Sequence, residues 1–311
     1  MKCLSLHITD ICNFSCSFCV WGETLVQSGE RIPKAELERF LIENRDQGFE
    51  MVNLHGGEPT LRRDLFEILS FIRNLGYPAV SIQTNGWALA NPRFARRLIE
   101  AGVSLFVVSL HGHTPDIHDT LSGAPGSFAR IISGIGQVLD LGGSIRTNTV
   151  IMRPNYRFLP QIVECAIESG ALHVNLSSLM PTGRASALDG HLMPTYAEIE
   201  GNVGAAIEAA KSRGAVATLE GFPRCAVRGY ENHCLLREMS EDEQVKCLIR
   251  GEVWQNHDSF VEDSCKMKRP ECLGCIHTRE CGGVYKLYVQ AKGWSEFQPV
   301  GPQISQVREV A

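Results

Sequence analysis

From residue 3 to about residue 220, short apolar runs alternate with longer segments in which apolar residues recur every three or four positions. The short runs predict buried strands, and the longer period predicts amphipathic helices. The predicted strands are 3–9, 51–55, 80–84, 104–110, 144–151 and 173–177, with a further short run at 215–220. The predicted helices cover 34–47, 63–75, 92–101, the stretch containing Ile131, Ile135 and Val138, 158–169 and 194–213.

Strands separated by helices, repeated about six times, predict βαβ units and a parallel sheet. A closed barrel of this kind has about eight units, so the choice lies between a doubly wound open sheet and a partial barrel. The hydrophobic pattern leaves both architectures open. In either one, the reactive groups belong at the carboxyl ends of the strands.

The pattern changes after residue 220. Residues 221–311 mix cysteine, glycine, proline and charged residues, with one short helical period around 241–250. A segment with so little apolar periodicity is a poor candidate for a hydrophobic core of its own, and a metal centre is the usual substitute. We therefore predict two domains, residues 1–220 and residues 221–311.

The composition is that of an ordinary globular protein, with 44% hydrophobic and 21% charged residues among 311, which excludes the disordered and fibrous classes. A formal net charge of −5 argues against nucleic acid or an anionic membrane surface as the partner. The N-terminus carries no export signal, and no apolar run is long enough to cross a bilayer. We expect a cytoplasmic chain whose thiols stay reduced.

Cysteine is the unusual residue, because the chain has twelve. Cys12, Cys16 and Cys19 follow the first predicted strand, in the loop at its carboxyl end. Three thiolates at this spacing can converge on one soft metal centre. A structural zinc site needs a closed set of ligands, whereas a [4Fe–4S] cluster held by three thiolates keeps one iron open for a reactant. The spacing favours a cluster and leaves zinc or unliganded thiols as alternatives.

The segment CNFSCSFC resembles the CxxxCxxC signature of radical S-adenosylmethionine (radical SAM) enzymes, including the aromatic Phe18 before the last cysteine. Further motifs stand at strand ends in the order of that family: HGGEPT at 55–60, SIQTNG at 81–86, and SLHG at 109–112 with HD at 118–119 and GSF at 126–128. The resemblance covers residues 3 to about 180. It implies an α/β fold, a partial (β/α)6 barrel, followed here by a small cysteine-rich C-terminal domain.

The resemblance also implies which residues bind the cofactors. Cys12, Cys16 and Cys19 would hold the [4Fe–4S] cluster and so be the catalytic residues. SAM would be bound by Phe18, Gly56, Gly57, Glu58, Thr84, Asn85, Ser109 and Arg146. Its amino group would lie against residues 56–58, and its carboxylate would meet Ser109 or Arg146. From the residues alone, the alternatives are a plain turn for Gly-Gly-Glu-Pro, a buried strand serine and a structural ion pair.

The histidines near these motifs admit two interpretations. His111, His113 and His118 could form a metal triad, but the resemblance favours orienting roles. His55 stands where relatives have threonine or a small residue, and it puts a polar ring near the predicted SAM site.

The C-terminal segment carries a second cysteine cluster. The spacing Cys272-x2-Cys275-x5-Cys281 resembles the SPASM or twitch extension of radical SAM enzymes, which bears auxiliary [4Fe–4S] clusters. A full SPASM element has another cysteine where Tyr285 stands, so we predict one auxiliary [4Fe–4S] cluster. Its fourth ligand would be Cys225, with Cys265 as the competitor.

The remaining cysteines have no ligand role in this scheme. Cys3 and Cys165 are predicted to lie in the core, where free cysteine is common. Cys234 or Cys247 could donate a hydrogen atom to a substrate radical, with a plain free thiol as the alternative.

By resemblance, the enzyme would cleave SAM to methionine and a 5′-deoxyadenosyl radical, which abstracts hydrogen from an unactivated C–H bond. A flavodoxin or ferredoxin would supply the electron. The SLHG…HD…GSF stretch and the cysteine-rich tail favour a peptide substrate that is crosslinked, oxidised or epimerised. The compactness of the chain favours a small-molecule dehydrogenase or epimerase, acting for instance on an aminoglycoside or sugar. A first strand at residue 3, with no peptide-recognition domain before it, weakens the peptide hypothesis. A non-enzymatic iron–sulfur or zinc scaffold would have no use for the Gly-Gly-Glu motif.

Overall fold

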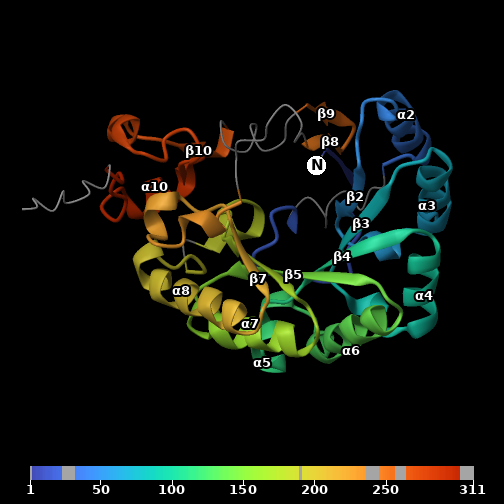
Figure 1. Cartoon of the computed structure of the whole chain (residues 1–311), viewed down its shortest axis with the longest axis horizontal. Helices are drawn as coiled ribbons and strands as arrows, with labels where there is room; N and C mark the ends of the chain where they lie inside the picture. Colours follow the sequence, from blue (N-terminus) through green and yellow to red (C-terminus); the bar gives the residue numbers. More distant parts are fainter. Residues whose placement is uncertain (1, 23–31, 189–190, 236–244, 256–263, 302–311) are drawn as a thin grey trace, which may run out of the picture.

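The computed structural model describes residues 2–22, 32–188, 191–235, 245–255 and 264–301. Its main feature is a nine-stranded sheet in the order β7-β6-β5-β4-β3-β2-β1-β8-β9 (Figure 1). Neighbouring strands pair in parallel, except that β9 is antiparallel to β8. The strands are β1 (Cys3–Thr9), β2 (Met51–Gly56), β3 (Ala79–Thr84), β4 (Val103–Ser109), β5 (Ser144–Ile151), β6 (His173–Ser178), β7 (Val216–Glu220), β8 (Val245–Ile249) and β9 (Glu252–Trp254).

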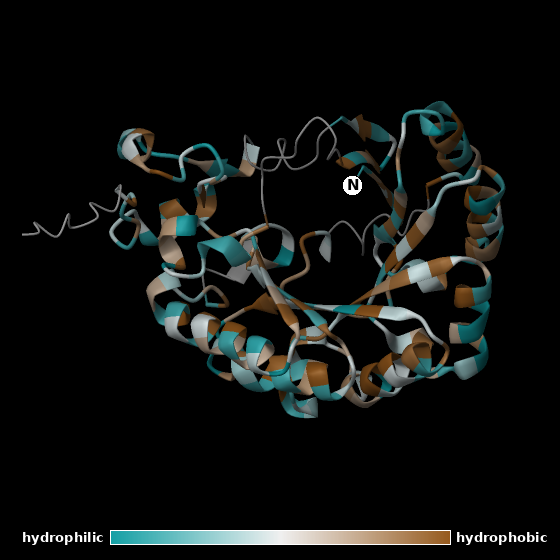
Figure 2. Ribbon diagram, viewed as in Figure 1, coloured by the Kyte–Doolittle hydropathy of each residue, from teal (hydrophilic) through white to brown (hydrophobic). Residues whose placement is uncertain are grey.

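Helices follow the outer rim of the curved sheet in Figure 1. They are α2 (Lys34–Asn44), α3 (Leu65–Asn74), α4 (Pro92–Glu100), α5 (Pro115–Ser122), α6 (Ser127–Asp140), α7 (Leu159–Glu168) and α8 (Tyr196–Ser212). In Figure 2 these helices carry both hydrophobic and hydrophilic residues, as amphipathic helices do. Within the described part of the chain, no helix combines the length and the apolarity that a membrane span requires.

Strand β1 shows how the sheet separates its two faces. Leu4, Leu6 and Ile8 are fully buried, and Ser5 alternates with them. Because successive side chains of a strand point to opposite faces, the apolar set packs under the helices and the polar set faces the barrel interior. There, Asn53 Nδ2 donates to Ser5 Oγ at 3.2 Å. The outer face of the sheet therefore belongs to the hydrophobic core, and the inner face carries polar groups.

The predicted fold class, a partial barrel, is confirmed. Among the described residues, no strand pairing joins the edge strands β7 and β9, so the sheet stays open. The predicted strands 3–9 and 144–151 coincide with β1 and β5. Helix α5 was not predicted, because it offers only Ile117 and Leu121 as an apolar face. Its limits nevertheless carry ordinary signals, with Pro115 at the start and Gly123 in the left-handed region at the end.

The predicted helix around 241–250 is wrong. Residues 245–249 form β8, which pairs in parallel with β1 from Cys3↔Val245 to Leu6↔Leu248. The edge of β1 offers unpaired backbone N–H and C=O groups, and pairing with them outweighs the weak helical period of this short segment. Residues 241–244 lie outside the described residues.

The C-terminal segment contacts α8 through Tyr288, Glu296 and Phe297. It contains a two-stranded antiparallel sheet, β10 (Lys266–Met267) with β11 (Val284–Tyr285), and the helix α10 (Lys286–Lys292), beside α8 in Figure 1. Tyr196 N–H on α8 donates to the Tyr288 hydroxyl at 3.3 Å, and the rings of Tyr196 and Phe297 lie 5.3 Å apart. Part of the predicted tail thus extends the main sheet, and the domain boundary at 220/221 stays a prediction.

Candidate active site at the end of strand β1

Cys12, Cys16 and Cys19 lie in the loop after β1, hereafter the cysteine loop, and line one cavity of about 420 Å³. Ligand pockets in proteins commonly measure about 300–1,000 Å³. Burial raises the pKa of Cys12 to about 11 and that of Cys16 to about 12, and the other thiols of the set add to the increase. These thiols therefore need a bound cation to become thiolates at neutral pH.

The donor set fits an iron–sulfur cluster. Each thiolate of a [4Fe–4S] cluster binds its own iron, so a cluster needs a wider set of thiols than a single metal ion. Among the described residues, no three His, Cys, Asp or Glu side chains are grouped to hold a single ion. Phe14 N–H donates to Cys12 Sγ at 3.4 Å, and hydrogen bonds of this kind tune the potential of a cluster.

Gly56 and Gly57 let the end of β2 approach the cysteine loop. Gly57 N–H donates to the Thr9 carbonyl and Glu58 N–H to the Ile11 carbonyl, each at 2.7 Å. A Cβ on either glycine would overlap one of these carbonyl oxygens, and Gly56 has a φ of 135°. Only glycine meets both demands. The glycine pair thus positions the cysteine loop, and its contact with SAM stays a prediction.

The Glu58 carboxylate connects the HGGEPT motif at the end of β2 with the SIQTNG motif at the end of β3. It accepts hydrogen bonds from Thr60 N–H (3.1 Å) and O–H (2.6 Å), from Thr84 O–H (2.7 Å) and from Asn85 N–H (2.7 Å). Burial raises the pKa of Glu58, while these donors oppose the increase. Asn85 Nδ2 in turn donates to Asn13 Oδ1 at 2.8 Å, inside the cysteine loop. Glu58 therefore accepts three hydrogen bonds at Oε1 and one at Oε2 from the protein, and its predicted contact with SAM stays a prediction.

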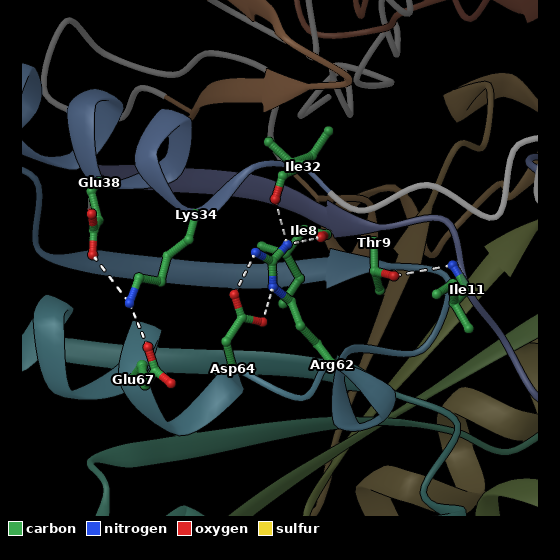
Figure 3. Close-up of polar contacts among 9 residues, drawn as sticks. All are labelled: Ile8, Thr9, Ile11, Ile32, Lys34, Glu38, Arg62, Asp64 and Glu67. Carbon is green, nitrogen blue, oxygen red and sulfur yellow. Dashed lines mark hydrogen bonds and ion pairs between the residues drawn. The ribbon is translucent and has the colours of Figure 1, made fainter.

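A buried arginine fixes the chain just before the cysteine loop (Figure 3). The Arg62 guanidinium donates to the carbonyls of Ile8, at the end of β1, and of Ile32, the latter at 2.8 Å. The same group pairs with the Asp64 carboxylate at 2.8 Å. Since both carbonyls are buried, the guanidinium supplies donors that they would otherwise lack.

Six of the predicted SAM-binding residues line the cysteine cavity: Phe18, Gly56, Gly57, Thr84, Asn85 and Ser109. Glu58 is not among its lining residues. Arg146 instead lines a larger cavity, of about 850 Å³, inside the barrel. The two cavities adjoin, because the same residues line both: Val20, Trp21, His55, Gln83, Met180 and Glu220. We call them the cysteine cavity and the barrel cavity.

The histidines after β4 are engaged by the backbone. His111 Nδ1 accepts a hydrogen bond from Val150 N–H at 3.2 Å, and His118 Nδ1 accepts one from His111 N–H at 3.1 Å. Burial lowers the pKa of both rings, that of His118 to about 4. The His113 ring packs 5.2 Å from that of Phe158. These contacts support orienting roles for His111 and His118.

Arg184 is a neighbour of the thiols that sequence reasoning missed. It follows β6 in a 3-10 turn, Gly183–Leu188. Its N–H donates to the Cys19 carbonyl at 3.1 Å and its Nη1 to the Cys16 carbonyl at 3.4 Å. Its positive charge lowers the pKa of both thiols, against the larger effect of burial. The one available signal was its place after the carboxyl end of a strand.

A buried ionic group was also missed. His7 Nε2 lies 2.6 Å from Asp10 Oδ1, and Arg250 Nη2 lies 3.1 Å from Asp10 Oδ2. The Arg250 guanidinium also stacks 5.1 Å from the Trp21 ring. Arg250 stands in the β8–β9 turn, so it reaches Asp10, two residues before Cys12, only because β8 pairs with β1.

The second cysteine set converges as well. Cys225, Cys272, Cys275 and Cys281 line one cavity, whereas Cys265 lines the barrel cavity. Burial raises the pKa of Cys225 to about 12, and the three other thiols add to the increase. Val300 N–H donates to Cys275 Sγ at 3.3 Å, and Gly283 N–H donates to Cys281 Sγ at 3.4 Å. This placement favours Cys225 over Cys265 as the fourth ligand.

The other cysteines differ in burial. Cys234 and Cys247 are buried, and Cys247 lines the barrel cavity. Cys3 and Cys165 are partly exposed, so their predicted place in the core is wrong. Cys3 has an inward position on β1 and also lines the barrel cavity.

The fold resembles that of known radical SAM proteins. The structure of Streptococcus suis SuiB bound to S-adenosylmethionine covers 98% of this chain, and this chain covers 77% of it, with a TM-score of 0.66 and 17% identity. The structure of native anSMEcpe with bound AdoMet covers 68% of this chain, and this chain covers 60% of it, with a TM-score of 0.52 and 18% identity. At these identities the likeness shows the fold alone.

Curated relatives match part of this chain at higher sequence identity. A probable GTP 3′,8-cyclase of Saccharolobus solfataricus is 34% identical over 184 residues, which are 58% of this chain and 58% of that protein. An AdoMet-dependent heme synthase of Methanosarcina barkeri is 30% identical over 188 residues, 60% of this chain and 53% of that protein. The matched part thus spans less than two thirds of either relative. The family model described as the radical SAM superfamily matches residues 6–160, which contain the cysteine loop and the motifs at 55–60, 81–86 and 109–128. The chain therefore belongs to the radical SAM superfamily.

Proposed function

We propose that this radical SAM enzyme abstracts hydrogen from an unactivated C–H bond of a peptide substrate, with its SAM-binding [4Fe–4S] cluster on Cys12, Cys16 and Cys19. When bound there, the cluster supplies the electron that cleaves SAM to methionine and a 5′-deoxyadenosyl radical. The observation that carries the proposal is the shared wall between the cysteine cavity and the barrel cavity. A radical formed in the first would lie next to a substrate held in the second.

The protein itself contributes position and exclusion of water. The cysteine loop is held at its two ends by backbone hydrogen bonds, from Gly57 N–H to Thr9 O and from Arg184 N–H to Cys19 O. Phe18 packs on the His111 ring at 4.6 Å on the cavity wall. A dry, preformed wall protects a reactive radical from water and from stray hydrogen donors.

Two observations bear on the substrate. A peptide is supported by the size of the barrel cavity, about 850 Å³, and by the fold of SuiB, which was also solved with the precursor peptide SuiA (TM-score 0.67 over 96% of this chain). A small molecule is the second candidate. The names of the curated relatives refer to GTP and to heme, and the barrel cavity includes polar side chains such as Ser5 and Asn53.

We further propose one auxiliary [4Fe–4S] cluster on Cys225, Cys272, Cys275 and Cys281. Its support is the single cavity that these four thiols line. Held by these four residues, a cluster would supply an acceptor or relay for the electron of a substrate radical. A flavodoxin or ferredoxin is the proposed electron donor.

Anaerobic reconstitution followed by iron and sulfide analysis tests the cofactor assignment. Two [4Fe–4S] clusters give about eight irons per chain and one gives about four. If the wild type holds only about four irons and Cys16→Ala loses them, the proposed auxiliary cluster is refuted and the SAM-binding cluster is retained. A wild-type protein that holds no iron refutes both clusters. The substrate is tested with a synthetic peptide whose sequence is taken from a short reading frame next to the gene and whose carbon positions carry deuterium. Transfer of deuterium to 5′-deoxyadenosine supports a peptide, and its absence while SAM is cleaved favours a small molecule.

A further inference from the structure

Arg146 is a partly buried cation of the barrel cavity that forms no ion pair within the described residues. It lies on β5 in register with Val107 of β4 and with His173 of β6. Val107 and Arg146 both line the barrel cavity, so the Arg146 side chain points inward. Its Nε atom is buried without a hydrogen-bond partner, and among the described residues no carboxylate pairs with its guanidinium. A guanidinium stays protonated in proteins, so the site carries a positive charge that is not neutralised by an ion pair within the described residues.

The charged groups nearby do not neutralise Arg146. Glu220 is close enough for its charge to raise the pKa of Arg146, against the larger effect of burial, which lowers it. However, Glu220 Oε2 already accepts hydrogen bonds from Asn175 Nδ2 at 2.6 Å and from Ser177 Oγ at 3.1 Å. The other arginine of the barrel cavity, Arg250, is occupied by Asp10. Within the described residues, Arg146 is therefore the arginine of this cavity that forms no ion pair, and its Nε–H has no acceptor.

An Nε–H group that is buried without an acceptor destabilises the folded protein unless a ligand completes its hydrogen bond. Its planar set of donors matches two oxygens of one carboxylate or phosphate. We propose that Arg146 binds an anionic oxygen group of the substrate, a carboxylate or a phosphate, inside the barrel cavity. This inference rests on the proposed function, because it names the substrate of the same site.

The position of Glu220 adds a second requirement. Glu220 lines both cavities, whereas Arg146 lines only the barrel cavity. A substrate anchored by its anion at Arg146 would therefore pass Glu220 on the way to the cysteine cavity. A hydrogen-bond donor on the substrate, such as an ammonium or a hydroxyl, would pair with the Glu220 carboxylate there. The pair of residues favours a polar substrate with an anionic end.

The first experiment measures the accessibility of Arg146 in the reconstituted holoenzyme. Phenylglyoxal modification of Arg146 is followed by peptide mass spectrometry, with SAM, pyrophosphate or glutarate as the protecting ligand. At about ten times its Kd, a bound anion lowers the rate about tenfold, because about a tenth of the sites stay free. Stronger protection by pyrophosphate points to a phosphate-bearing substrate, and stronger protection by glutarate to a carboxylate. Protection by SAM alone would instead assign Arg146 to the SAM carboxylate and overturn the proposal, as would an unprotected or unmodified Arg146.

The second experiment compares Arg146→Gln and Arg146→Lys with Arg96→Gln, an exposed arginine on α4. In Arg146→Gln, we expect the affinity for the protecting anion to fall about 10- to 100-fold, as for the loss of a charged hydrogen-bond donor. The lysine variant should recover part of it, and Arg96→Gln should change nothing. In the Arg96→Gln control, the Kd for SAM and the substrate-free formation of 5′-deoxyadenosine should also match the wild type. A normal anion affinity in Arg146→Gln contradicts the inference, whereas wild-type protein that never cleaves SAM contradicts only the proposed function.

Discussion

The replacement Glu58→Gln separates a structural role of the Gly-Gly-Glu motif from a cofactor-binding one. The Glu58 carboxylate is 1% exposed and accepts four hydrogen bonds from Thr60, Thr84 and Asn85. Glutamine keeps the shape but turns one acceptor oxygen into an NH2 group. If its remaining oxygen keeps the Thr60 and Thr84 donors, the NH2 group faces Asn85 N–H, so two donors meet in a buried site.

The expected effect is a loss of about 2–4 kcal/mol in the free energy of unfolding, from one charged hydrogen bond and one buried donor left without an acceptor. It should appear in apoprotein without SAM, because every partner of Glu58 belongs to the chain. Urea unfolding under reducing, anaerobic conditions measures it. The control is Glu67→Gln, which removes a carboxylate that is 65% exposed and pairs with Lys34; such surface pairs contribute about 0–1 kcal/mol.

Unchanged stability of the Glu58→Gln apoprotein would contradict the structural role. If the apoprotein of Glu58→Gln unfolds within about 0.5 kcal/mol of the wild type, a change typical of surface positions, the four hydrogen bonds are not stabilising the fold. If its Kd for SAM then rises as well, the carboxylate acts on the cofactor. That combination would restore the role implied by family resemblance and refute the structural one.

Three further results are expected. Cys16→Ala should abolish the reductive cleavage of SAM, and 5′-deoxyadenosine that still forms would contradict the ligand assignment. Because burial lowers the pKa of His118 from 6.5 to about 4, the unfolded chain binds the proton more tightly; stability is complete above pH 6.5 and falls by up to about 3 kcal/mol as the pH drops to 4. Urea unfolding at pH 6.5 and at pH 4 measures this loss of stability. The contribution of His118 to the loss should be absent in His118→Gln and unchanged in His113→Gln. Cys225→Ser should lower the iron content by up to about four per chain while Cys265→Ser leaves it unchanged, and the reverse pattern would make Cys265 the ligand.

The sequence predicts the repeated part of the fold well because that part follows from periodicity. In β1 and β5, apolar residues alternate with polar ones or follow one another over seven and eight residues, which is long enough to identify a strand from the sequence. Strand β8 has five residues and its partner β1 lies more than two hundred residues earlier, so local pattern could not find it. Pairing across such a distance depends on a free strand edge, which a local reading of sequence does not contain.

The thiols of the candidate site could be predicted because their spacing is itself the signal. Cys12, Cys16 and Cys19 come together in one cavity, as the motif requires. Arg184 and Arg250 could not be found in this way, because each reaches the cysteine loop from a distant element. The role of Arg146 was also ambiguous, since a strand pattern gives the face of a side chain but not the cavity that it enters.

The positioning of the cysteine loop follows from how many elements converge on the last residues of β1. From the β2 side, Gly57 and Glu58 bond the backbone at Thr9 and Ile11. The β8–β9 turn reaches Asp10. Each contact uses a buried backbone group or a buried charge, and each would lose its hydrogen bonds if the loop moved. The chain therefore fixes the loop before any cofactor arrives, whereas the second cysteine set lies among short elements, β10, β11 and α10, with little regular structure to hold it. Cofactor binding should thus complete the first site and stabilise the second.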